Sequence, residues 1–291
     1  MLLIIGAIKI LPGSGSKEPK PFDIKGMGVL IVALAAMMTA ITSIDTSSIL
    51  TSFLTLDVGG CLLLLMLLIA VFWRIEKQAT DPIVEPTLFE SSQITKSCII
   101  SLGTSALQSG SVFLPALLVL SLEMEPADAA LLLLPGILVA TVAAPIQGRL
   151  ITRLGTRSII LASQVLVGIA LAVYALVDMN VMTFIIASMI GGIGSAGLSG
   201  APIRFIVLAE TDNHNRTAAQ GLLSVVSSIG RLLGAAMVGA VAASQGGGVN
   251  GYQSAFLALL MLGLLILLIA LTLNSRSVEA TTARGDAVTA K

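Results

Sequence analysis

Residues 128–148 read DAALLLLPGILVATVAAPIQG, an apolar run in which only the first residue carries a charge. About 20 mostly apolar residues are enough for an α-helix to cross the hydrocarbon core of a bilayer. Inside lipid the backbone must satisfy its own hydrogen bonds, so only helices and closed barrels can span it. The run is continuous and rich in Leu and Ala instead of alternating, which favours a helix over a barrel strand. This stretch therefore predicts a transmembrane helix.

The rest of the chain repeats this pattern. Of its 291 residues, 56% are apolar and only 11% are charged, whereas a soluble domain has about 25% charged residues. Apolar runs long enough to span a bilayer occur at 26–44, 53–73, 97–122, 128–148, 158–177, 181–208, 217–243 and 254–273. The sequence therefore predicts an all-α membrane protein with eight transmembrane helices embedded in a lipid bilayer.

The charged and metal-binding residue types exclude several classes of function. Lys and Arg together number 16, as do Asp and Glu, so no basic excess indicates a nucleic-acid partner. Cys61, Cys98 and His214 share no metal-ligand spacing, so we expect neither a metal nor a cofactor. No Gly-rich phosphate loop and no Ser/His/Asp arrangement is present, so we do not expect an enzyme. A membrane-embedded enzyme is the weakest option, because the helices offer no mid-membrane acid or Cys/His pair.

The loops between the runs differ in charge according to the side of the membrane that they would face. If residues 12–25 are cytoplasmic and the spans alternate, nearly all Lys and Arg fall on the inner side, as the positive-inside rule requires. The opposite loops contain no Lys or Arg, and the acids among them are Asp45, Glu123, Glu125 and Asp178. We therefore expect a multi-pass protein of the cell membrane with a cytoplasmic C-terminus. One basic residue, Arg231, lies within a span.

The spacing of the runs indicates how the chain is divided. The longest internal connection, 74–96, contains Pro82 and Pro86. Residues 1–11 are apolar but too short to span, and no basic residue precedes them as in a signal peptide, so we interpret them as the end of a helix without its beginning. The predicted units are a helix remnant and cytoplasmic loop (1–25), two linker helices (26–73), a cytoplasmic connection (74–96), a six-helix bundle (97–274) and a disordered cytoplasmic tail (275–291).

Polar and small residues recur at helical spacing in three of the six C-terminal runs: 97–122, 181–208 and 217–243. The runs 158–177 and 254–273 are nearly uniformly apolar. Since a helix that is apolar all round needs no aqueous face, we predict an inner ring of striped helices around a cavity and plain outer helices facing lipid. The candidate cavity-lining residues are Thr104, Gln108, Ser195, Ser224 and Arg231.

A packing role competes with this interpretation. Small and hydroxyl residues in membrane helices often mark close helix contacts, and Gly230 with Gly234 forms a GxxxG pair of that kind. Arg231 is different, because a charged residue at mid-helix costs at least about 2.5 kcal/mol in a bilayer. It therefore faces either a structural partner, such as a carboxylate or a carbonyl, or a transport pathway.

Four short motifs resemble those of a known family. Residues 148–157, GRLITRLGTR, resemble the G-x-L-x-D-R-x-G-x-R signature of the major facilitator superfamily, as repeated in its C-terminal half. Residues 22–26, FDIKG, and the segment from Pro82 to Phe89 resemble stretches of its fourteen-span drug:proton antiporter branch. Arg231 with Gly234 and Gly239 is similar to the R-x-x-G-x-x-x-x-G helix of that branch. The chain differs from the signature at Thr152, where the main copy has Asp.

The resemblance implies a secondary transporter that works by alternating access, in which two six-helix bundles rock about a central site. It implies a cytoplasmic gate formed by Gly148, Leu150, Arg153, Gly155 and Arg157. The two glycines would permit a tight turn beside neighbouring helix ends. The arginines would pair with carboxylates or helix C-termini.

The predicted function is therefore proton-coupled efflux of a small organic, drug-like substrate by alternating access, with this chain as the C-terminal portion. The partner expected from the resemblance is an N-terminal six-helix bundle, which would carry the proton-coupling acids, and without which the chain would not transport. The alternatives are a non-transporting membrane scaffold or partner subunit, or an inactive truncated fragment.

Overall fold

The computed structural model describes residues 24–43, 56–76, 91–199, 201–211 and 216–273, and within these ranges it is built of helices and turns. Among the described residues, seven helical segments are long and apolar enough to cross a membrane. The helix over Ile24–Thr42 has a shorter apolar part, Gly26–Ile41. The predicted all-α membrane fold of about eight spans is thus confirmed. The helices are α2 (Ile24–Thr42), η1 (Leu56–Gly60), α4 (Cys61–Glu76), α5 (Ser92–Ser109), η3 (Gly110–Phe113), α6 (Leu114–Leu122), α7 (Pro126–Leu131), α8 (Leu134–Leu154), α9 (Thr156–Leu176), α10 (Val181–Leu198), α11 (Ala201–Ala209), α12 (Arg216–Ser244) and α13 (Val249–Ala270).

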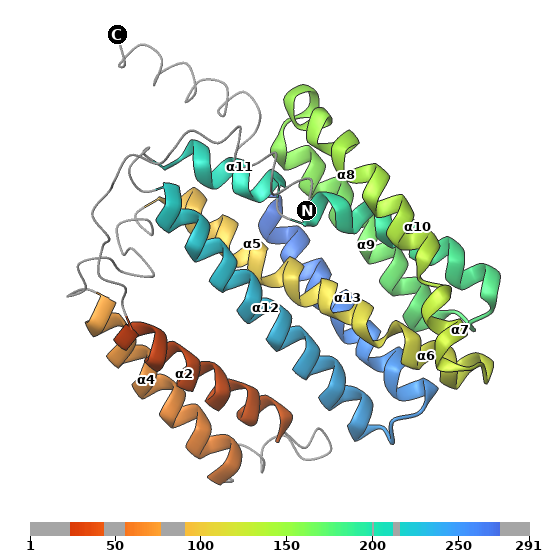
Figure 1. Ribbon diagram of the computed structural model, residues 1–291, viewed down its shortest axis with the longest axis horizontal. Helices are drawn as coiled ribbons and strands as arrows, with labels where there is room; N and C mark the ends of the chain where they lie inside the picture. Colours follow the sequence, from red (N-terminus) through yellow and green to blue (C-terminus); the bar gives the residue numbers. More distant parts are fainter. Residues whose placement is uncertain (1–23, 44–55, 77–90, 200, 212–215, 274–291) are drawn as a thin grey trace, which may run out of the picture.

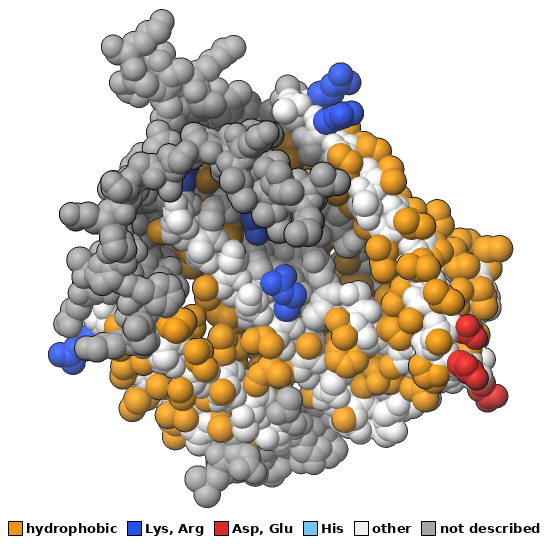
Figure 2. All heavy atoms as spheres, in the orientation of Figure 1, with side chains coloured by type: hydrophobic (Ala, Val, Ile, Leu, Met, Phe, Trp, Pro, Cys, Tyr) orange, Lys and Arg blue, Asp and Glu red, His pale blue; other side chains and the backbone are white. Residues whose placement is uncertain are grey.

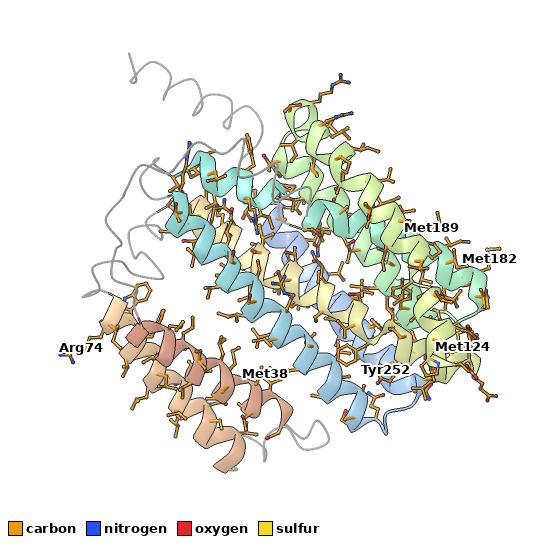
Figure 3. The ribbon with its side chains drawn as sticks, in the orientation of Figure 1. Met38, Arg74, Met124, Met182, Met189 and Tyr252 are labelled. Carbon is orange, nitrogen blue, oxygen red and sulfur yellow. The ribbon has the colours of Figure 1, made fainter. Side chains whose placement is uncertain are left out.

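The helices form a two-helix pair beside a larger bundle (Figure 1). α2 packs against α4 and, on its other side, against α12. Within the bundle, α5 packs against α12 and α13, while α10 lies against both α8 and α9. The contact of α13 with α9 joins the two groups of helices. Side chains such as Met182 and Met189 point away from the bundle on α10 (Figure 3) and are exposed, as expected for a surface that meets lipid.

Glycines let pairs of helices approach until their backbones are in contact. A Cβ added at Gly230 or Gly234 of α12 would meet the carbonyl oxygens of Leu102 and Ala106 on α5. This confirms the helix-contact role predicted for the GxxxG pair. Between α8 and α10, a Cβ at Gly136 would lie 2.7 Å from the carbonyl oxygen of Ser188. Small residues thus bring helices together where lipid offers no hydrophobic driving force for association.

Two of the predicted spans, 97–122 and 181–208, are interrupted beside the pockets described below, and a third, 128–148, is interrupted between α7 and α8. The first passes from α5 through the 3-10 turn η3 into α6, and Pro115 stands in the first turn of α6. The second changes from α10 to α11 after Ser199, shortly before Pro202. Each of the two interruptions beside the pockets coincides with a proline, whose ring cannot donate the helical hydrogen bond.

The prediction that the plain helices lie outside the cavity is wrong, because Phe256 of α13 lines a pocket and several residues of α9 do so as well. The larger contribution comes from α9. Half of its most apolar stretch is buried, more than in any other span among the described residues. Its buried face contains Ser163 and Gln164, and its side chains Val167 and Tyr174 line a pocket. The reason is that helix faces packed against protein and faces exposed to lipid are built from the same apolar residues. Hydropathy therefore does not distinguish a buried helix from one that faces lipid.

Acidic and basic residues lie at opposite ends of the bundle. Glu123 and Glu125 stand between α6 and α7, whereas Arg149 and Arg153 lie in the last turns of α8. Figure 2 shows the red and blue side chains at these opposite ends. The charge segregation predicted from the sequence thus follows the long axis of the bundle. The predicted helix remnant 1–11, most of the connection 74–96 and the tail 275–291 lie outside the described residues.

Candidate functional site

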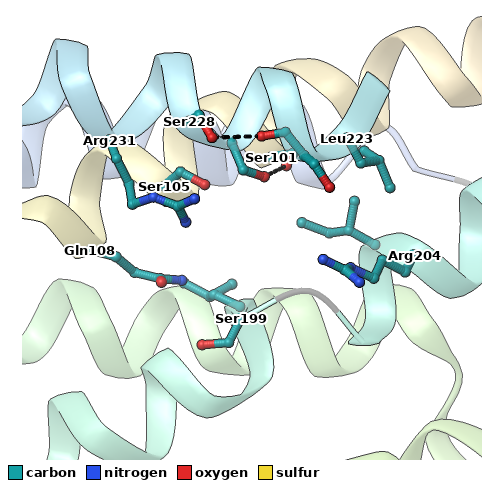
Figure 4. A pocket seen from close by; sticks show the side chains of 12 residues that line it. Ser101, Ser105, Gln108, Ser199, Arg204, Leu223, Ser228 and Arg231 are labelled. Atoms are coloured by element: carbon teal, nitrogen blue, oxygen red, sulfur yellow. Dashed lines mark hydrogen bonds between the residues drawn. The ribbon is translucent and has the colours of Figure 1, made fainter. Parts of the chain in front are cut away.

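An open pocket of about 250 Å³ lies between α5, α12 and the junction of α10 with α11 (Figure 4). Most of the side chains that line it are polar, and we call it the polar pocket. Its lining consists of Ser101, Ser105, Gln108, Leu198, Ser199, Ile203, Arg204, Leu223, Ser224, Ser227, Ser228 and Arg231.

The polar wall follows from helical periodicity. Residues three or four apart share one face of a helix, so Ser224, Ser227, Ser228 and Arg231 of α12 are presented together. Ser224 and Ser228 each donate their hydroxyl proton to a main-chain carbonyl oxygen of their own helix, at 3.0 and 2.9 Å. The hydroxyls of Ser227 and Ser101 lie 2.9 Å apart and form a hydrogen bond between α12 and α5. The hydroxyls of these three serines of α12 are therefore already engaged in hydrogen bonds within the protein.

Two arginines enter the polar pocket from different helices. Figure 4 shows Arg231 of α12 and Arg204 of α11 extending into the same space from opposite ends. Neither guanidinium forms an ion pair or hydrogen bond with another described residue, and no Asp or Glu is among the described residues that line the pocket. The pocket therefore carries a net positive charge that the described part of the chain does not neutralise.

A second, larger pocket of about 670 Å³ adjoins the first, and we call it the apolar pocket. The two pockets share Gln108, Ser199 and Arg231 in their linings. The apolar pocket extends between α5, α8, α9 and α10 as far as Tyr174 and Phe256, whose rings lie 5.6 Å apart. The two adjoining pockets, which we call the joined cavity, have a cationic end and an aromatic and aliphatic end.

The structure brings most of the predicted cavity residues together. Gln108 and Arg231 line both pockets, Ser224 lines the polar pocket, and Ser195 lines the apolar pocket. Thr104 lines neither, because it is 1% exposed and its hydroxyl donates to the carbonyl oxygen of Ser101 at 3.2 Å.

Several pocket residues lie outside the predicted set of five, and Ser199 and Arg204 are among them. Ser199 lines both pockets and Arg204 lines the polar pocket. Arg204 falls within an apolar run, and counting charges places it simply at the cytoplasmic edge. The signal that could have found it is Gly200 with Pro202, a pair typical of a helix break. A break there redirects the chain, so that Arg204 turns back toward the cavity.

The residues of the predicted gate lie where α8 turns into α9. Leu150 and Arg153 belong to the last turns of α8, and Arg157 to the first turn of α9. Gly155, between the helices, has φ 83° and ψ 158°, a conformation essentially restricted to glycine. Gly148 lies inside α8, and a Cβ there would have no atom within 4 Å. The tight turn therefore depends on Gly155, and Gly148 lies in open space.

The chain is similar in sequence to a known protein family and to individual proteins. The sequence pattern of the family described as Major Facilitator Superfamily matches residues 97–290. The chain is 27% identical over 237 residues to the uncharacterized MFS-type transporter YfiU of Bacillus subtilis (strain 168), covering 80% of this chain and 46% of that protein. It is 22% identical over 248 residues to the multidrug resistance protein Stp of Mycobacterium tuberculosis, covering 79% of this chain and 42% of Stp. The chain thus spans less than half the length of these curated relatives.

Proposed function

Because the chain belongs to the Major Facilitator Superfamily, we propose that it forms the C-terminal part of a secondary transporter that exports small amphipathic organic compounds in exchange for protons. Of the two relatives, YfiU carries the name of a transporter, in agreement with the expectation that the chain is not an enzyme. Export of drug-like compounds is supported by the name of one of them, the multidrug resistance protein Stp. The antiporter-like motifs of the sequence support proton exchange.

The observation that carries the proposal is the joined polar and apolar cavity. Substrate sites of transporters lie near the bilayer midplane, where interrupted helices expose backbone groups. Two of the interrupted spans border this cavity, through Gln108 and Gly110 at the α5 break and Ser199 at the α10 break. A cavity with polar and apolar ends suits a substrate that has both kinds of surface, and binding it needs no covalent chemistry.

The proposed partner is a second six-helix bundle. Gln108 is partly exposed and Arg231 is exposed on the open side of the cavity. Contact of these groups with hydrocarbon would be costly, and an opposing bundle would cover them. In the proposed mechanism the two bundles rock about the cavity. The turn at Gly155, with Arg153 and Arg157, would form part of the inner gate at the end of the bundle that we propose to be cytoplasmic.

The proposal is tested by reconstitution in vesicles with an imposed proton gradient. The 291-residue chain is reconstituted alone, and in parallel after co-expression with the part of YfiU that the match to this chain leaves uncovered, which would supply the second bundle. A panel of fluorescent lipophilic dyes of both charges is offered. We expect gradient-dependent transport only when both bundles are present. Transport by the chain alone would contradict the need for a second bundle, and no transport of any dye in either preparation would favour a scaffold role.

A further inference from the structure

We propose that the joined cavity accepts an amphipathic organic anion, with its anionic group between Arg204 and Arg231 and its apolar body in the apolar pocket. This inference rests on the proposed function, because it names the substrate class of the same cavity. It uses side chains that have no partner among the described residues.

The first observation is an excess of positive charge. Arg204 and Arg231 line the polar pocket, and neither pocket has Asp or Glu among the described residues of its lining. Two like charges that share one pocket repel each other, by an amount that grows as the local dielectric constant falls. Arg231 also lies near the middle of α12, where a charge is costly in a membrane. A bound anion would offset both costs, whereas a bound cation would add a third positive charge.

The second observation is a set of unused hydrogen-bond donors beside these charges. Ser105 is 7% exposed, lines the polar pocket, and makes no side-chain hydrogen bond with another described residue. The side-chain amide of Gln108 is likewise without a partner among the described residues. Most neighbouring serines, in contrast, already bond to carbonyl oxygens or to each other. Anionic oxygens accept such donors in short, charge-assisted hydrogen bonds.

The third observation is the position of the apolar pocket relative to these donors. Gln108 and Arg231 line both pockets, so an anionic group bound by them stands where the two pockets adjoin. Elsewhere the lining of the apolar pocket includes side chains such as Leu171, Tyr174 and Phe256. An aromatic or short aliphatic body attached to the anionic group would fill this space. The cavity therefore fits a molecule that is anionic at one end and apolar at the other.

Binding of two probes that share one apolar body tests the proposal. Naphthalene-2-sulfonate and 2-naphthylmethylammonium are titrated by equilibrium dialysis against the chain in nanodiscs of zwitterionic lipid, and binding to empty nanodiscs is subtracted. We expect the sulfonate to bind at least about tenfold more tightly than the ammonium probe, a difference of about 1.4 kcal/mol. Equal affinities, tighter binding of the ammonium probe, or no binding of either would overturn the proposal.

Variants assign the preference to the two arginines. Arg204→Gln and Arg231→Gln are each expected to weaken sulfonate binding about tenfold and to leave ammonium binding unchanged or stronger. Arg231→Lys should keep most of the preference because it keeps the charge. Arg74→Gln is the matched control, since Arg74 points away from the bundle at the end of α4 (Figure 3). A preference that survives both glutamine variants would refute the assignment, and Arg204 on the separate helix α11 provides a test even if Arg231→Gln fails to fold.

The outcome is distinguishable from that of the transport assay. Anion binding by the chain, without transport of any dye by the assembled bundles, would support the anion site and refute the proposed function. Transport of cationic dyes together with poor sulfonate binding would support the proposed function and refute the anion site.

Discussion

Gln164 on α9 donates a hydrogen bond from its Nε2 atom to the main-chain carbonyl oxygen of Gly263 on α13, at 3.0 Å, and both residues are buried. The other end of the same amide, Oε1, has no hydrogen-bond partner among the described residues. This polar link stands in the contact that joins α9 to α13, and hence the two groups of helices in the bundle. Its two ends have opposite effects on stability, because one hydrogen bond is made and one buried acceptor is left unsatisfied.

Replacement of Gln164 by Leu should therefore change stability very little. Hydrogen bonds between membrane helices contribute about 0.6 kcal/mol on average, and the substitution also removes the unsatisfied Oε1 atom. We expect the free energy of unfolding to change by less than about 1 kcal/mol. Gln164→Ala leaves a cavity and should cost about 2 kcal/mol or more. Denaturant titration in detergent micelles measures both. A large loss in the Leu variant would show that the hydrogen bond itself holds α9 to α13.

Gly230→Ala and Gly234→Ala should each separate α12 from α5. The added methyl group would meet the main-chain oxygens of Leu102 and Ala106, which cannot move aside as a side chain can. Overpacking of this kind costs about 1–3 kcal/mol. Gly221→Ala and Gly239→Ala are matched controls on the same helix, because a Cβ at either position has no atom within 4 Å.

These control substitutions should be neutral or stabilising, since Ala favours a helix over Gly by about 1 kcal/mol. The midpoint of thermal unfolding in detergent compares all four variants. Equal midpoints across the set would contradict the close packing of α12 on α5.

Gly155→Ala should destabilise the turn between α8 and α9, whereas Gly148→Ala should not. Gly155 has a positive φ of 83°, and a side chain in that region of φ and ψ costs about 1–3 kcal/mol. Gly148 is helical and in open space. Thermal unfolding of the two variants provides the comparison. In the assembled transporter, Gly155→Leu and Arg153→Ala are expected to lower transport while the protein stays in the membrane, and unchanged transport in both would reduce the motif to an ordinary loop.

The orientation of the bundle is tested by cysteine labelling. In a chain whose Cys61 and Cys98 are replaced by Ser, single cysteines are introduced as Asp178→Cys and Arg153→Cys. Because basic loops stay in the cytoplasm, an impermeant maleimide applied to intact cells should label position 178 and spare position 153 until the cells are opened. Labelling in the reverse order would invert the proposed topology.

The sequence predicted the number and positions of the helices well, because a bilayer demands long apolar segments and hydropathy detects them directly. The run 158–177, for example, corresponds to α9 at Thr156–Leu176. The separation of acidic from basic loops was also predicted from the sequence, and Glu123 and Arg153 lie at opposite ends of the bundle. Of the five predicted cavity residues, Gln108, Ser195, Ser224 and Arg231 line the pockets, because polar side chains avoid lipid.

What the sequence left open depends on packing between distant segments. Thr104 has the polarity of a cavity residue, yet it is buried and bonds to its own helix. Gln164 lies in a helix that looks uniformly apolar, and its partner is 99 residues away. Arg204 reaches the cavity only because the chain breaks after Ser199. No local pattern records such contacts, since each depends on which helix lies opposite.

The pair α2 and α4 contacts the bundle chiefly through α2 and α12, and only 6% of the apolar stretch Val58–Ile75, which contains most of α4, is buried. The buried face of α2 contains the small residues Ala33, Ala36 and Ala40. A hairpin attached in this way can be gained or lost during evolution without rebuilding the interior of its host. It can also enter the bilayer during synthesis as a self-contained unit, before the helices that it will later accompany have emerged from the ribosome.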